Sequence, residues 1–141
     1  RSWLQKIKNP KKYFIEKIKK LQKNIKFFKN KNLIFTILLT NSSKIKKLNK
    51  KFRKKNKPTD VLSFPYFTPK ELKAFKEKKI YIGDIAISYE VIYLRSKRSN
   101  FHLEFDKVWV HGLLHLIGYN HVKNKDYLKM EKFEKRILNL I

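Results

Sequence analysis

The sequence predicts an α/β fold, in which amphipathic helices alternate with short apolar strands around one hydrophobic core. Its 141 residues suit one domain, and 42% of them are hydrophobic, which is enough apolar material to form a core. Apolar residues recur at helical spacing in several segments, whereas residues 33–40 and 80–88 are short apolar runs rich in β-formers. These runs fall short of the roughly 20 residues that a membrane helix needs, so no membrane partner is expected.

The first part of the chain is predicted to form a helix, a strand and a second helix. The first helix begins at Asn9-Pro10, because Asn is a favoured N-cap and proline fits the first helical turn. A buried strand follows over 33–40, and Asn41-Ser42 ends it and caps a helix that runs to Arg53. The apolar stripes of these helices are Phe14, Ile18, Leu21 and Ile25, and then Ile45, Leu48 and Phe52.

Two strands separated by a short helix are predicted next. The strands cover 61–64 and 80–88, and Gly83 suggests a bulge or a close backbone approach in the second strand. Between them, Thr68-Pro69-Lys70-Glu71 has the pattern of a capping box, which predicts a helix over about 69–78.

The last part of the chain is predicted to be helical. Residues 89–98 are interpreted as a helix, although Val91, Ile92 and Tyr93 also suit a strand. A buried helix is expected over 103–117, because apolar residues occur on nearly all of its sides. A final amphipathic helix is expected over about 126–138.

The formal net charge of +25 is concentrated in the N-terminal part of the chain. Residues 1–58 hold 21 basic residues against one acid, Glu16, a net charge of +20. Such charge favours RNA, DNA or acidic lipid as a partner, although the lysine content also fits the codon bias of an AT-rich genome. The chain has no cysteine, which excludes disulfides and thiolate metal sites and favours a reducing cytoplasm.

Three of the four histidines fall in the pattern His111-x-x-x-His115-x-x-Gly118-x-x-His121. Histidines four residues apart project from one face of a helix, and Gly118 can end that helix and turn the chain back. Three imidazoles can hold a catalytic zinc with one coordination position left open. The alternative is that these histidines pack or cap the helix.

The spacing is similar to that of the metzincin peptidases, H-E-x-x-H-x-x-G-x-x-H. Those peptidases carry glutamate as the general base directly after the first histidine. Gly112 occupies that position here, and it cannot transfer a proton. The pattern therefore predicts the metal ligands without the peptidase base.

Four segments, one of them the histidine stretch, carry a specific resemblance over nearly the whole chain. They are Asn49-Lys-Lys-Phe-Arg53, Pro58-Thr-Asp-Val-Leu-Ser-Phe-Pro65, Gly83-Asp-Ile85 and the stretch from His111 to His121. Their order and spacing resemble the YbeY family of bacterial endoribonucleases, which are ribosomal RNA maturation factors. The tail Met130-Glu131-x-x-Glu134 also resembles the C-terminal helix of this family.

The resemblance implies a single α/β (α+β) domain over residues 1–141, with a small mixed four-stranded sheet, five to six helices and a zincin-like metal helix. It implies one zinc ion per chain, held by His111, His115 and His121. The implied activity is cleavage of single-stranded RNA in 16S ribosomal RNA 3′-end maturation and ribosome quality control. The implied partners are ribosomal RNA, the small subunit and its assembly factors.

Arg53 and His115 are the predicted catalytic residues. Only five of the 36 basic residues are arginine, and a guanidinium can hold two phosphate oxygens at once. The resemblance also places the important arginine of the family at this position. The alternative is an ordinary surface arginine at a helix end.

Other polar residues could support the site. Asp60 and Asp84 lie at strand ends, where either could orient a ligand histidine or merely cap a strand or pair with lysine. His102 is expected to have a packing or surface role. Asn120 departs from the family, which usually has Asp before the third histidine, and could weaken a hydrogen bond near the metal or slightly raise the Lewis acidity of the site. Residues 68–79 are interpreted as a basic surface insertion.

A metal-dependent endoribonuclease is the favoured function, with either water or the 2′-hydroxyl of RNA as the nucleophile. Two alternatives stay open: a non-catalytic ribosome assembly factor with structural zinc, and a zinc peptidase. The first would explain the charge by RNA binding alone. The second is weakened by Gly112 and by the strongly basic chain.

RNA affinity is expected to fall steeply with salt concentration, because residues 1–58 carry most of the positive charge. Each neutralised phosphate contributes about −0.7 to the slope of log affinity against log salt for single strands. Binding measured from low to physiological salt tests this expectation. A nearly flat dependence would indicate that the lysines reflect codon bias and form no binding surface.

Overall fold

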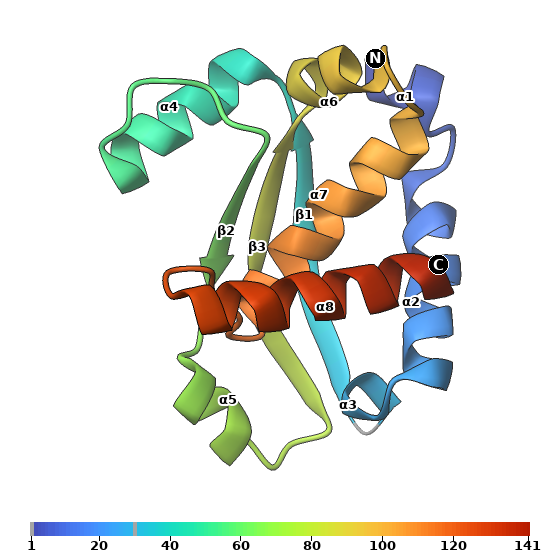
Figure 1. Ribbon diagram of the computed structural model, residues 1–141, viewed down its shortest axis with the longest axis vertical. Helices are drawn as coiled ribbons and strands as arrows, with labels where there is room; N and C mark the ends of the chain where they lie inside the picture. Colours follow the sequence, from blue (N-terminus) through green and yellow to red (C-terminus); the bar gives the residue numbers. More distant parts are fainter. Residues whose placement is uncertain (1, 30) are drawn as a thin grey trace.

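The computed structural model describes residues 2–29 and 31–141 (Figure 1). Arg1, one of the basic residues counted above, lies outside this part of the chain. Within it the elements are α1 (Ser2–Lys6), α2 (Pro10–Asn24), α3 (Lys26–Lys29), β1 (Asn32–Thr40), α4 (Ser42–Arg53), β2 (Val61–Pro65), α5 (Pro69–Ala74), β3 (Lys79–Ser88), α6 (Tyr89–Ser96), α7 (Phe101–Leu116) and α8 (Asn124–Leu140). None of these helices is both long and apolar enough to cross a lipid bilayer.

The sheet is mixed, as predicted, but it has three strands in the described residues, so the expected number of four was wrong. The strand order is β1-β3-β2, with β1 parallel and β2 antiparallel to β3. The segment that could have supplied another strand, Val91 to Tyr93, lies in α6, where Ile92 is fully buried. The expected five to six helices were also too few, because α1 and α3 are too short to show helical periodicity.

The predicted elements otherwise agree with the structure, apart from their ends. The capping box of Thr68 and Glu71 is confirmed, but α5 ends at Ala74 and not near 78. It ends there because Phe75 takes an extended backbone conformation and packs against Phe67, with ring centroids 5.1 Å apart. The C-terminal helix begins at Asn124, two residues earlier than predicted.

Gly83 forms the bulge that its position in β3 predicts. The pairing of β1 with β3 shifts between Ile34 and Phe35, which pair with Tyr81 and Gly83 respectively. Gly83 has a φ of +141°, and a Cβ here would lie 2.2 Å from the carbonyl oxygen of Phe64. Only glycine therefore allows β2 and β3 to approach so closely at this point.

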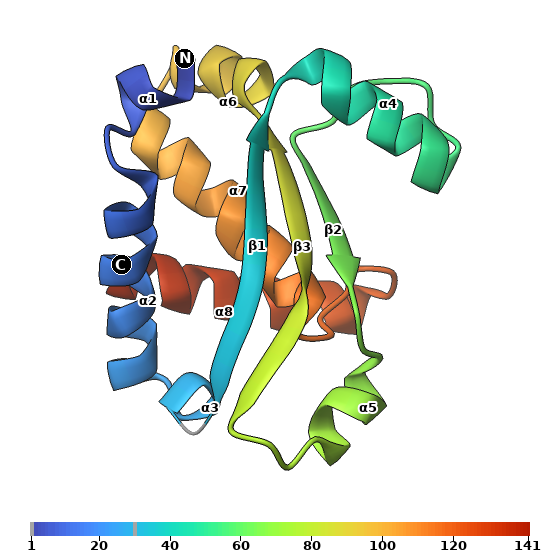
Figure 2. The ribbon, with the colours of Figure 1, turned by 180° about the vertical axis from the view of Figure 1, so that it is seen from behind.

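The two faces of the sheet are covered differently. Helices α7 and α8 lie over one face, which is seen in front in Figure 1. Figure 2 shows the other face, where α4 lies at one end of the sheet. There Ile45 of α4 packs with Leu62 of β2 and Ala86 of β3 in a small separate cluster. The larger cluster lies between the sheet, α2, α7 and α8.

A buried polar network fixes α2 against α7. Asp106 is only 8% exposed and accepts hydrogen bonds from the Tyr13 hydroxyl at 2.7 Å, Lys17 Nζ at 2.7 Å and Trp109 Nε1 at 2.8 Å. Burial raises the pKa of Tyr13, and the hydrogen bond to Asp106 acts in the same direction. All three donors are thus satisfied by one carboxylate.

Asp106→Ala is expected to lower the free energy of unfolding by about 3–5 kcal/mol, because it leaves the Lys17 ammonium and two further donors without their acceptor. Urea denaturation measures this loss. Glu131→Ala is the matched control, because it breaks an exposed ion pair with Lys135 (3.0 Å) and should cost less than about 1 kcal/mol. Equal effects of the two substitutions would contradict a stabilising role for the network.

Candidate metal and phosphate site

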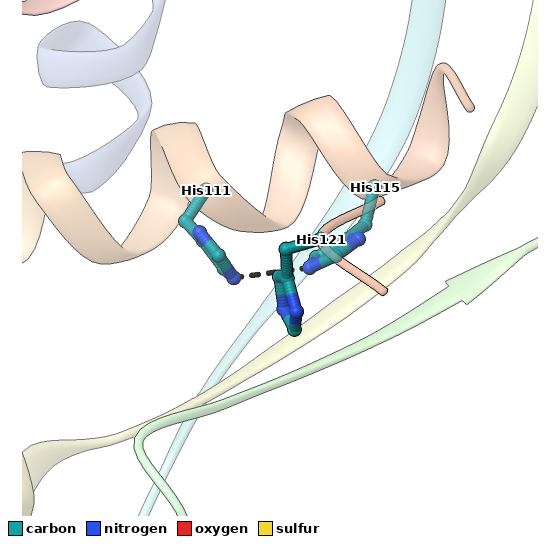
Figure 3. Close-up of side chains that lie close together, drawn as sticks. All are labelled: His111, His115 and His121. Carbon is teal, nitrogen blue, oxygen red and sulfur yellow. Dashed lines mark hydrogen bonds between the residues drawn. The ribbon is translucent and has the colours of Figure 1, made fainter. Parts of the chain in front are cut away.

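His111, His115 and His121 converge on one point (Figure 3). His111 and His115 lie one turn apart on α7, and His121 lies in the loop that follows. One ring nitrogen from each residue lies within 4.8 Å of the corresponding atoms of the other two. The predicted spacing therefore does bring the three imidazoles together.

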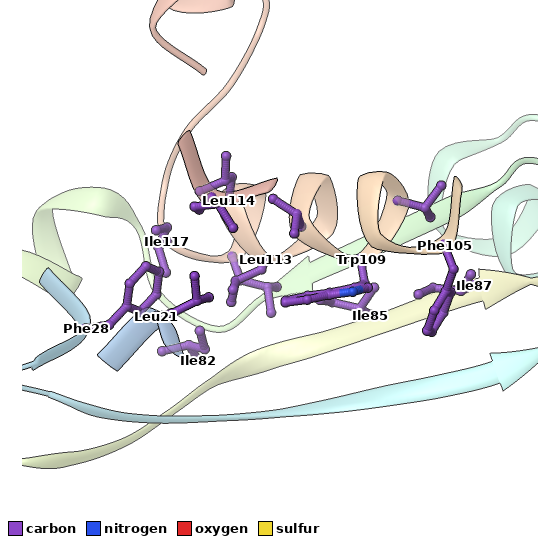
Figure 4. Packing of buried hydrophobic residues seen from close by; sticks show 14 of the residues in the cluster. Leu21, Phe28, Ile82, Ile85, Ile87, Phe105, Trp109, Leu113, Leu114 and Ile117 are labelled. Atoms are coloured by element: carbon purple, nitrogen blue, oxygen red, sulfur yellow. The ribbon is translucent and has the colours of Figure 1, made fainter. Parts of the chain in front are cut away.

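Helix α7 carries two of the histidines because it is anchored in the core. Its residues Trp109 and Leu113 pack against the sheet, where Ile85 of β3 lies among them (Figure 4). At Gly112 the helix lies close to the sheet. A Cβ at this position would lie 2.9 Å from Ile85 Cγ2 and 3.2 Å from Val61 Cγ2. The position that holds the general base in metzincins thus faces the sheet and has no room for a side chain.

The loop after α7 turns the third histidine back toward the first two. Gly118 has a φ of +102°, as expected for a glycine that ends a helix. A Cβ on Gly118 would lie 2.8 Å from Pro69 Cγ, so α5 packs directly against this turn. The segment 68–79 is therefore more than a surface insertion, since it supports the loop that carries His121.

Hydrogen bonds define the protonation of two ligands. His111 Nδ1 lies 2.6 Å from Glu134 Oε1, and His115 Nδ1 lies 2.9 Å from the carbonyl oxygen of Tyr119. Ionised carboxylates and carbonyls only accept hydrogen bonds, so both Nδ1 atoms carry the proton. In the neutral rings, each Nε2 then presents a lone pair.

These lone pairs suit a shared cation. The two Nε2 atoms lie 3.0 Å apart. Two nitrogens bound tetrahedrally to zinc at 2.0–2.1 Å would be about 3.3 Å apart, which is close to this distance. The three histidines thus fit a divalent metal ion, with an exposed third ligand, His121, on the solvent side.

The surroundings of His115 keep it neutral. Burial lowers its pKa to about 4, and the charges of His111, His121 and Arg53 act in the same direction, while the hydrogen bond to Tyr119 opposes them. At neutral pH the ring is therefore available as a ligand. The influence of Arg53 on this pKa also places its guanidinium within electrostatic reach of the histidines.

Arg53 ends α4 and reaches toward β2. Its Nη2 lies 3.5 Å from the carbonyl oxygen of Ser63, a long contact that leaves most of the guanidinium free. The Ser63 hydroxyl in turn donates to the carbonyl oxygen of Gly112 at 3.0 Å. One strand residue thus contacts both Arg53 and the helix that carries the histidines.

Comparison with known proteins agrees with this arrangement. The family model described as endoribonuclease YbeY matches residues 3–141. The chain belongs to the YbeY family. It is 46% identical to the endoribonuclease YbeY of Pelagibacter ubique, over 99% of this chain and 89% of that protein.

Other members and a solved structure show the same relationship. The endoribonuclease YbeY of Buchnera aphidicola subsp. Acyrthosiphon pisum is 39% identical over 92% of this chain and 79% of its own length. The solution structure of TM1509 from Thermotoga maritima superposes with a TM-score of 0.62 at 26% identity, covering 92% of this chain and 82% of that one. The fold is therefore that of a YbeY-like protein.

The acid that orients a histidine in this YbeY-family chain is neither of the two considered from the sequence. Asp60 pairs with Arg95 at 2.6 Å, and Asp84 accepts a hydrogen bond from the Tyr81 hydroxyl. Glu134 of α8 takes this position instead. In the sequence, the feature that pointed to Glu134 was its place four residues after Met130 in the tail that resembles the family. The sequence did not show that α8 packs beside His111.

Two other polar residues lie apart from the ligand nitrogens. His102 is exposed in the first turn of α7, with its ring 5.8 Å from that of Tyr13, as expected for a surface role. Asn120 accepts a hydrogen bond from the backbone N–H of Val122 at 3.4 Å. This hydrogen bond lies within the loop that carries His121.

Glu134→Gln is expected to weaken binding of a divalent ion by about 10- to 100-fold, because the neutral amide no longer makes His111 more basic through its Nδ1–H. Calorimetric titration with zinc against a competing chelator measures the change. His121→Ala sets the loss caused by removing a ligand, and Glu131→Gln on the same helix is the control. Unchanged zinc affinity in Glu134→Gln would show that this hydrogen bond does not support the ligand.

Proposed function

We propose that this protein is a zinc-dependent endoribonuclease that cleaves single-stranded RNA. The observation that carries the proposal is the convergence of His111, His115 and His121 beside Arg53 in a chain of the YbeY family. The three imidazoles can bind zinc, and the guanidinium can bind phosphate. Together the two groups suit chemistry on a phosphate ester, because the metal ion and the guanidinium can both bind phosphate oxygens.

Different residues of the chain would have different roles in RNA cleavage. Zinc, when bound, supplies a Lewis acid that activates water or polarises a phosphate oxygen. Glu134 and the carbonyl oxygen of Tyr119 hold His111 and His115 in the ligand tautomer. Arg53 presents a planar fork that can hold two phosphate oxygens and stabilise the charge that develops on them. The catalytic role proposed for His115 is to hold the metal ion as a neutral ligand, because burial lowers its pKa to about 4.

Family membership supports a more specific role in the cell. We propose that residues 1–141 act as one domain on the 3′ end of 16S ribosomal RNA and in ribosome quality control. The partners would be the small subunit and its assembly factors. The location would be the cytoplasm, where ribosomes are assembled. The basic residues 1–58 suit such a polyanionic partner.

Two alternatives are less well supported by the geometry. An assembly factor with structural zinc would be expected to have a closed coordination shell, whereas three histidines with an exposed His121 leave a position open. A zinc peptidase needs a base after the first histidine, and Gly112 lies too close to the sheet to be replaced by one.

A cleavage assay on single-stranded RNA, with and without chelator, separates these functions. The endoribonuclease should cut RNA, lose activity in chelator and recover it with one equivalent of zinc per chain. An assembly factor would bind RNA without cutting it, and a peptidase would cut a casein substrate. Cleavage that persists after complete metal removal would overturn the role of zinc.

Arg53→Ala is expected to lower RNA turnover by roughly 10²- to 10³-fold while zinc content and fold stay intact, because one preorganised donor to the phosphate is lost. Arg53→Lys should recover little, since an ammonium lacks the two-pronged geometry. Single-turnover cleavage at saturating RNA measures both. Arg98→Ala, which removes another exposed arginine, is the control, and near-normal turnover of Arg53→Ala would remove Arg53 from the mechanism.

A further inference from the structure

Four aromatic side chains gather on the sheet face that faces away from α7. They are Phe52 at the end of α4, Phe64 on β2, Tyr66 just after β2 and Tyr81 on β3, and together we call them the aromatic platform. Phe52 is 56% exposed and Tyr66 is 60% exposed, which is unusual for rings of this size. Within the described residues, Figure 2 shows no helix over this part of the sheet beyond the end of α4.

The rings are arranged in two pairs. The ring centroids of Phe52 and Phe64 lie 5.2 Å apart, and those of Tyr66 and Tyr81 lie 5.1 Å apart. Phe64 and Tyr66 are two residues apart along one strand direction, and the hydrogen bond from Tyr66 N to Ile82 O (2.9 Å) continues the ladder. Alternate residues of a strand lie on the same face about 7 Å apart, so the two pairs form consecutive steps.

The aromatic platform lies directly beside the proposed catalytic site. Phe52 immediately precedes Arg53, and Phe64 immediately follows Ser63, whose carbonyl oxygen Arg53 contacts. Successive strand residues point to opposite faces, so Ser63 faces α7 while Phe64 faces outward. Because β2 is an edge strand, a chain held at Arg53 can pass over this edge and onto the platform.

The charges beside the aromatic platform favour a polyanion. Residues 42–59, which form α4 and the loop after it, contain nine basic residues and no acid. The Lys51 ammonium lies 5.3 Å from the centre of the Phe52 ring. The acid on this face is Asp84, which accepts a hydrogen bond from the Tyr81 hydroxyl. Exposed rings bordered by lysines are the arrangement with which proteins stack the bases of single-stranded nucleic acid.

We propose that the aromatic platform binds the bases that flank the cleaved phosphate, and so makes the enzyme select single-stranded RNA. The inference rests on the proposed endoribonuclease function and names a binding site for its substrate. Bases can stack on these rings only when they are unpaired, since a duplex keeps them stacked on one another. The phosphates would follow the lysines of α4, while the bases lie on the rings.

The test measures binding in the presence of chelator, so that it does not depend on cleavage. The probe is a fluorescently labelled 12-nucleotide single-stranded RNA, and the variants are Phe52→Ala and Tyr66→Ala. Each is expected to weaken binding by about 5- to 100-fold, the range for losing one stacked base. Tyr127→Ala, which removes a 52% exposed ring from α8, is the matched control and should bind like the unmodified protein.

Three further measurements make the outcome specific. The fluorescence of 2-aminopurine in the RNA should be quenched by the unmodified protein, less by Tyr66→Ala, and fully again by Tyr66→Trp. Affinity for a duplex of the same length should not change in either alanine variant. Urea denaturation checks that each variant is folded.

The outcomes separate this inference from the function on which it rests. If the protein cuts no RNA but the platform variants lose single-strand binding, the platform stands and the endoribonuclease fails. Equal binding by all variants overturns the platform, whether or not RNA is cut. Equal losses for single-stranded and duplex RNA also overturn it, because stacking would then not be the cause. Sedimentation that shows a dimer, dissociated by Tyr66→Ala without loss of RNA binding, would assign this face to a second copy of the chain.

Discussion

The approach of α7 to the sheet at Gly112 is the constraint on which the site depends. The helix lies so close there that a Cβ would be 2.9 Å from Ile85 and 3.2 Å from the Ser63 hydroxyl oxygen. This contact sets the distance between α7 and the strands β2 and β3. It therefore also sets the position of His111 and His115. A larger residue would require these side chains or the helix itself to shift, because close-packed cores transmit such changes.

The same contact connects the three histidines with Arg53, the residue proposed to bind phosphate. Ser63 donates from its side chain to Gly112 and offers its carbonyl oxygen to Arg53, so one residue of β2 touches both parts of the site. The histidines come from residues 111–121 and Arg53 from α4, more than fifty positions earlier in the chain. The β2 strand is what holds these two distant segments in one geometry.

The sequence was sufficient to predict those parts of the site that depend on local spacing. His111 and His115 share a helix face, Gly118 ends the helix, and the capping box starts α5, because each of these features involves residues a few positions apart. Glu134 could not be assigned to His111 in this way, since their contact depends on how α8 packs across α7. Asp60 and Asp84 seemed equally suitable candidates, but only Asp60 lies at a strand end, directly before β2, whereas Asp84 lies inside β3, so its predicted place at a strand end was wrong.

The fourth strand that the resemblance implied does not form in the described residues, whereas the helix predicted over 89–98 is confirmed as α6. Val91 to Tyr93 also have the composition of a strand, and local propensity cannot distinguish a buried helix face from a buried strand in so short a segment. What decides is packing: Ile92 is fully buried as one face of α6, which lies against α7. Similarly, α5 ends early because the Phe75 ring packs against Phe67, and helical periodicity in the sequence does not reveal this contact.

The basic residues and the three histidines lie in different segments of the chain, and Arg53 lies between them. Residues 108–122 contain no lysine, arginine or acid, whereas α4 and the following loop contain nine basic residues. Burial lowers the pKa of His115 to about 4, so the ring is neutral at pH 7 and can bind a metal ion. A lysine-rich surface can gather RNA, but mobile ammonium groups cannot fix one phosphate at the ligands. The last turn of α4 places the Arg53 guanidinium, whose Nη2 lies 3.5 Å from the Ser63 carbonyl oxygen, between the basic surface and the uncharged candidate metal site.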